Sequence, residues 1–79
     1  MPRLPSVSGA RLARLLESLG YVFVRQKGSH ARYTLQTRNG EHHITIPLHA
    51  SVAKGTLNDI LTQAALRTGQ SRDDLISKL

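Results

Sequence analysis

A short cationic stretch with one histidine is the part of this sequence best suited to chemistry. It runs from Arg25 to Tyr33, reads RQKGSHARY, and gathers positive side chains around a Gly-Ser pair. Imidazole is the side chain whose unperturbed titration lies nearest neutrality, so His30 can take or give a proton. The cations around it would hold a phosphate or stabilise a developing negative charge. The stretch therefore predicts a site that handles RNA, with His30 doing the chemistry.

Two β-rich runs flank this stretch and should fix its geometry. Tyr21–Val24 is crowded with β-branched and aromatic residues, and residues 30–36 are the predicted return strand after a Gly-Ser turn. Side chains of a strand point alternately to its two faces. The alternation places His30 and Arg32 on the solvent face and Tyr33 on the core face.

Helices are predicted before and after these strands in the sequence. Ser8 is a suitable N-cap for a helix to about Leu19, with leucines at positions 12, 15, 16 and 19 forming one apolar stripe. A second helix is predicted from near Gly55-Thr56 to Thr68. Ser71 should cap a short final helix, whose apolar residues could dock on the domain or on a partner.

A third strand completes the expected sheet. Asn39-Gly40 is a hairpin turn signal that leads into residues 41–47, where Ile44 and Ile46 should point to the core. A helix, a three-stranded antiparallel meander, a helix and a short C-terminal helix make an α+β two-layer sandwich. The same order describes the double-stranded-RNA-binding fold, although a fold alone does not establish a function.

Composition limits the kinds of protein this can be. The 79 residues leave room for one domain, with residues 1–7 as an N-terminal arm and residues 70–79 as a helical extension. Without cysteine there is neither a disulfide scaffold nor a thiolate metal site. No apolar run is long enough for a membrane span, and the start lacks the apolar region of a signal peptide. We therefore expect a soluble, cytoplasmic protein.

The charge points to a polyanionic partner. The formal net charge is +6, from 11 Lys and Arg against 5 Asp and Glu. Such a field favours nucleic acid, or an acidic protein that occupies the same surface. Candidate RNA contacts are the side chains of Arg25, Lys27 and Arg32 with the backbone amides of Gly28 and Ser29.

Four further residues are considered for RNA or metal binding. His49, in the loop after the third strand, could approach His30 as a second proton carrier or an RNA contact. Lys54 precedes the second helix, and helix N-termini bind phosphates, although a solvated lysine beside a simple cap is an equal alternative. His42 and His43 adjoin, so their side chains should point to opposite faces and not share one metal ion. We expect no metal site.

Several segments that occur in order along the chain form a recognisable set. They are LLESLGY (15–21), RQKGSH (25–30) with Tyr33, ITIP (44–47) with His49, GTL (55–57), and Ile60-Leu61 with Gln63-Ala64. Together they resemble the HicA-type toxins (the YcfA group) of bacterial HicA–HicB toxin–antitoxin pairs, over roughly residues 8 to 66. The resemblance implies a double-stranded-RNA-binding-like fold and metal-independent cleavage of messenger RNA, with no cofactor. It also implies a HicB antitoxin that shields the active face.

The family's catalytic histidine corresponds to His30 through the Gly28-Ser29-His30 match. One departure is Ala31, where many members carry a polar or basic residue. Because Ala31 should face the core, the departure should leave His30 little affected. The expected mechanism is transesterification, in which the RNA 2′-hydroxyl attacks the adjacent phosphate after losing its proton.

The sequence is also compatible with two other functions. His30 could be an exposed histidine that only binds phosphate, which would make the protein a non-catalytic RNA-binding module of the same fold. A pure protein-interaction module, whose basic face meets an acidic partner, is a third class. The sequence contains no Walker loop, dinucleotide fingerprint, Ser-His-Asp order or paired carboxylates, so we expect no small-molecule substrate.

Overall fold

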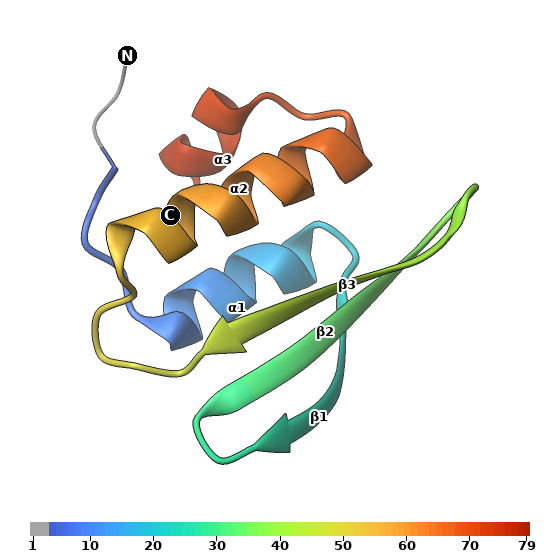
Figure 1. Ribbon diagram of the computed structural model, residues 1–79. Helices are drawn as coiled ribbons and strands as arrows, with labels where there is room; N and C mark the ends of the chain where they lie inside the picture. The colour runs from blue at the N-terminus through green and yellow to red at the C-terminus, as the bar shows by residue number, and fades with distance from the viewer. Residues whose placement is uncertain (1–3) are drawn as a thin grey trace.

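The chain folds as two layers, a sheet and a layer of helices. The computed structural model describes residues 4–79, so residues 1–3 of the predicted arm lie outside the described residues. The elements follow the order α1 (Gly9–Ser18), β1 (Val22–Lys27), β2 (His30–Thr37), β3 (Gly40–Pro47), α2 (Lys54–Thr68) and α3 (Arg72–Ser77). The strands form one antiparallel sheet in the order β1-β2-β3, and the helices cover one face of it (Figure 1). This confirms the predicted α+β sandwich, which is consistent with a double-stranded-RNA-binding-like fold.

One hydrophobic core lies between the layers. α1 begins where predicted, because the Ser8 hydroxyl accepts a hydrogen bond from the Arg11 amide at 3.1 Å. The leucine stripe of α1 faces the inner side chains of the sheet, and α2 packs its own apolar stripe alongside. α3 docks on this core through Leu75, and Arg72 donates a hydrogen bond to the side chain of Asn58 in α2. The fully buried large side chains are Leu12, Leu16, Ile46, Leu57, Leu61 and Leu75.

The inner and outer faces of β2 and β3 follow the predicted alternation. Ala31, Tyr33, Ile44 and Ile46 are buried, whereas His30 is exposed. We call the side of the sheet away from the helices the open face.

The β2–β3 turn lies one residue earlier than predicted. Arg38 and Asn39 form the turn, and Gly40 is the first residue of β3, opposite Thr37. Gly40 has a φ of +109°, a conformation that side chains disfavour, so glycine is needed just after the turn instead of within it. The Thr37 hydroxyl supports this geometry by donating to the Gly40 carbonyl at 2.7 Å. β1 is also longer than predicted and reaches Lys27, which pairs directly with His30.

The start of α1 packs tightly against the end of β3. A Cβ on Gly9 would lie 2.2 Å from the Pro47 carbonyl oxygen and 2.7 Å from the Leu48 Cα. This approach lets the Gly9 amide donate to the His49 carbonyl at 2.9 Å. The loop after β3 is also tied to the β1–β2 turn, because the Leu48 amide donates to the Ser29 carbonyl at 2.6 Å. Backbone bonds thus hold this loop, which has no regular structure of its own.

Towards the other end of the sheet, Tyr21 and His42 connect β3 to the segment before β1. The Tyr21 hydroxyl is hydrogen-bonded to His42 Nδ1 at 2.9 Å, and the two rings meet edge to face with centroids 6.0 Å apart. Burial, helped by the positive charge of Arg67 and, to a smaller extent, His43, holds the pKa of His42 below its usual range, although Gln63 acts in the opposite direction. Burial likewise raises the pKa of Tyr21, against the effect of Arg67. Both rings are therefore uncharged near neutral pH.

Replacing Gly9 by alanine tests the contact between α1 and β3. We expect Gly9→Ala to lower the free energy of unfolding by about 1–3 kcal/mol, because the new methyl group overlaps backbone atoms that cannot rotate away. Urea unfolding followed by circular dichroism measures this. Gly55→Ala in the first turn of α2 is the matched control, since nothing lies within 4 Å of its Cβ position. It should leave stability unchanged or raise it by up to about 1 kcal/mol. Equal effects of the two substitutions would contradict the tight contact.

The lowered pKa of His42 predicts a pH-dependent stability. An unfolded histidine takes up a proton near pH 6.5, whereas folded His42 does so only at a lower pH. The unfolded state therefore binds more protons in this window, so the contribution of His42 is complete above about pH 6.5 and falls as the pH drops. We expect the loss of stability between pH 7.5 and pH 5.5 to be smaller in His42→Gln than in the parent. Equal slopes in the parent and in His42→Gln would refute the assignment.

Candidate active site on the open face of the sheet

A β-bulge in β1 decides which of its side chains reach the open face. Phe23 lies opposite Tyr33 and Arg25 lies opposite Arg32, so Val24 is an extra residue without a partner in the pairing. A bulge of this kind shifts the alternation by one. Phe23 therefore points to the helix side, with its ring 5.7 Å from that of Tyr33, whereas Arg25 points to the open face.

The open face presents cross-strand rows of side chains. The first row is Lys27, His30 and Pro47, the second is Arg25, Arg32 and Thr45, the third is Val22, Thr34 and His43, and the fourth is Gln36 and Glu41. The first two rows surround a shallow pocket. Its lining residues are Arg25, Lys27, His30, Arg32 and Thr45.

This pocket has the charge of an anion site. Three cations and one imidazole converge on it, and the lining side chains include no carboxylate. Arg25 lies directly opposite Arg32, and like charges in this arrangement destabilise a sheet. Because these side chains project from paired strands instead of a loose loop, their backbone positions are well fixed. The predicted cluster of His30, Arg25, Lys27 and Arg32 is thus brought together, with Thr45 as a member that the sequence did not reveal.

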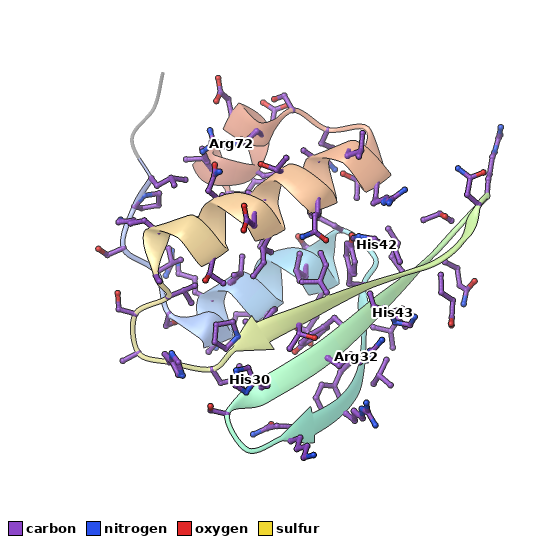
Figure 2. The ribbon with its side chains drawn as sticks, viewed as in Figure 1. His30, Arg32, His42, His43 and Arg72 are labelled. Atoms are coloured by element: carbon purple, nitrogen blue, oxygen red, sulfur yellow. The ribbon has the colours of Figure 1, made fainter. Side chains whose placement is uncertain are left out.

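His49 lies beside His30, as the sequence suggested it could. The two imidazole rings have centroids 6.4 Å apart and are inclined by 64°. The Leu48–Ser29 backbone bond joins the residues that precede these two histidines, so it holds both at the same edge of the sheet. In Figure 2 His30 lies at the start of β2, near the loop that follows β3.

The remaining predicted RNA contacts lie outside the pocket lining. Gly28 and Ser29 form the turn between β1 and β2, with Gly28 at a φ of +59°. Lys54 is the first residue of α2, one before the predicted start, and its ammonium group donates to the Leu4 carbonyl at 2.7 Å. That contact holds the N-terminal arm against α2. RNA binding by these three residues stays a prediction.

His42 and His43 point to opposite sides of β3, as predicted. Figure 2 shows His42 on the helix side and His43 away from it, on the side of Arg32. His43 Nε2 lies 3.7 Å from the Glu41 carboxylate. Within residues 4–79, no three His, Asp or Glu side chains gather closely enough to hold a metal ion.

Two structural residues of the site escaped the sequence analysis. Val24 looks like any strand-forming residue, so nothing in the sequence marks it as the bulge. Gly9 did carry a signal, because glycine directly after an N-cap weakens a helix and calls for another explanation. That explanation is the close approach of Pro47.

None of the helices within residues 4–79 combines the length and apolarity that crossing a membrane requires. No curated protein and no solved structure matches the chain. The model of one protein family, described as the HicA toxin of bacterial toxin–antitoxin, matches residues 9–66, which include α1, the whole sheet and most of α2. The chain therefore belongs to the HicA family, the toxins of bacterial toxin–antitoxin systems.

Proposed function

We propose that this toxin is an endoribonuclease that cleaves messenger RNA by transesterification, with His30 as a general acid or base. The observation that carries the proposal is the pocket in which Arg25, Lys27 and Arg32 converge on one imidazole without a carboxylate among the lining residues. A bound phosphodiester would remove the repulsion between Arg25 and Arg32 that the sheet pairing imposes. Because messenger RNA is translated in the cytoplasm, the proposed activity is a cytoplasmic one.

The chemistry uses two proton transfers on opposite sides of one phosphate. One imidazole of the pair His30 and His49 takes the proton of the 2′-hydroxyl, whose oxygen then attacks the phosphorus. The other imidazole gives a proton to the departing 5′-oxygen, so the products are a 2′,3′-cyclic phosphate and a 5′-hydroxyl. With centroids 6.4 Å apart, the two rings are near enough for one phosphodiester that lies across both of them to make a hydrogen bond of about 2.8 Å with each.

The cations stabilise the negative charge that grows on the phosphorus. Arg25 and Arg32 stand in the row next to His30, and Lys27 stands beside it in the same row. Preorganised donors of this kind commonly supply a large part of a rate enhancement. The nucleophile belongs to the substrate and the side chains carry the compensating charge, so this reaction needs no metal ion.

Replacing each histidine tests the mechanism. We expect His30→Ala to lower the rate of cleavage of a defined RNA at least about 100-fold, because a proton acceptor or donor is lost. His49→Ala, measured at its optimal pH, should lower the cleavage rate less than His30→Ala does. It should also remove one limb of a bell-shaped pH profile of kcat/KM, since the pair needs one neutral and one protonated ring. Mapping of the cut ends should show the cyclic phosphate.

The controls separate catalysis from binding. His30→Ala should keep its circular dichroism spectrum and its affinity for RNA, and parent activity should survive EDTA. A His30→Ala protein that cuts as fast as the parent would refute the mechanism and favour a non-catalytic RNA-binding module. RNA affinity that does not fall with rising salt would instead favour a protein-interaction module, because phosphate contacts weaken with salt.

Family membership implies a cognate antitoxin partner, and we propose that it covers the same pocket. An acidic or occluding antitoxin surface would neutralise the cations that would otherwise hold RNA. We expect RNA and antitoxin to compete, and Arg25→Glu to weaken the toxin–antitoxin complex at least about tenfold. Arg38→Glu, an equal charge change in the β2–β3 turn at the far tip of the hairpin (Figure 1), is the control. Simultaneous binding of RNA and antitoxin would contradict a shared surface.

A further inference from the structure

The third row of the open face takes no part in the proposed proton transfers, yet it has two unusual features. Val22 is 62% exposed, because no helix covers this side of the sheet. The hydroxyl oxygen of Thr34 is shielded from solvent and has no hydrogen-bond partner within the described part of the chain. A bound group could relieve both an apolar side chain in water and an unpaired polar atom.

The neighbouring rows limit what this group can be. Along β2 and β3, successive rows of one face lie two residues apart, or about 7 Å, close to the distance between adjacent phosphates of an extended strand. The second row offers Arg25 and Arg32 to a phosphate. In the fourth row, Gln36 donates to the Glu41 carboxylate at 2.9 Å, and this negative charge opposes a phosphate. The third row therefore suits a neutral, flat group attached to an anion that is held at the second row.

His43 supplies an aromatic surface at this position. Its ring stands on the open face on the side of Arg32 (Figure 2), with 40% of the side chain exposed. Histidine is among the side chains on which the unstacked bases of single-stranded RNA stack. A ring across the sheet from an exposed valine offers an apolar surface for one base.

We propose that Val22, Thr34 and His43 form a subsite for one nucleobase of single-stranded RNA, the base next to the phosphodiester that lies beside His30. The inference rests on the proposed function, because the cationic pocket sets the register of the strand. The base stacks on the His43 ring and packs against Val22. When the base binds, the side chains that shield the Thr34 hydroxyl move aside, and the hydroxyl then supplies the hydrogen bond that favours some bases over others at this position.

A cycle of protein and RNA changes tests the subsite. The probe is a short, fluorescently labelled single-stranded RNA, with one abasic nucleotide placed at each position in turn. Binding is measured by anisotropy in the His30→Ala background, which prevents cleavage. At one position the abasic nucleotide should weaken binding about 5- to 20-fold, and in His30→Ala/His43→Ala the same change should cost less than about twofold. Adding His43→Phe instead should restore the dependence, because a ring is again present.

The controls keep this inference separate from the proposed nuclease activity. Leu66→Ala removes an apolar side chain that is 74% exposed on α2, and in the same background it should leave the dependence on the base unchanged. In otherwise unmodified protein, Thr34→Val should alter the preferred base at the mapped cut sites.

An equal abasic effect with and without His43 would overturn the subsite, even if the parent protein cleaves RNA. Base-dependent binding that needs His43, in a protein that does not cleave, would support the subsite and refute the nuclease. An unchanged cut-site preference in Thr34→Val would overturn the role of the hydroxyl.

Discussion

The extra residue in β1 is the constraint on which the open face depends. With strict alternation, Arg25 and Lys27 would lie on the same side as Phe23, facing the helices. Two cations brought towards an apolar core without partners would cost more than a domain of this size can supply. The bulge at Val24 lets an apolar first half and a cationic second half coexist in one strand. The same residue thus protects the core and assembles the pocket.

A second constraint brings the two histidines together. His30 follows a tight turn and His49 lies in a loop without regular structure, so neither position is guaranteed by the sheet alone. The Leu48 amide bond to the Ser29 carbonyl joins the turn to the loop, and the Gly9 amide bond to the His49 carbonyl holds the loop on α1. The second bond requires a residue without a side chain at the start of α1. The first residue of α1 therefore contributes to the geometry of a site on the other layer of the protein.

Much of this arrangement could be predicted from residue patterns. The Ser8 cap, the leucine stripe and the alternation in β2 each follow a single local rule, and the structure confirms them. The bulge could not be predicted, because it depends on how two strands pair and not on the residue that is inserted. The β2–β3 turn was misplaced by one residue for a related reason, since the Asn-Gly signal specifies a glycine with positive φ but not its place relative to the strand pairing. The pairing of the strands and the close packing of the backbone thus determine the features that local sequence patterns do not specify.

The open face lowers the folding stability of the isolated protein. It places Arg25 against Arg32 and leaves the Thr34 hydroxyl without a partner among residues 4–79, and every residue of β1 is exposed. Stability must then come from the inner face of the sheet and the helix layer, where the fully buried side chains lie. A ligand that binds only the folded state adds stability that grows with the logarithm of its concentration relative to Kd. The same features that weaken the free sheet are those that a polyanion would relieve, so the proposed functions of this face, RNA binding and antitoxin binding, both follow from one uncompensated surface.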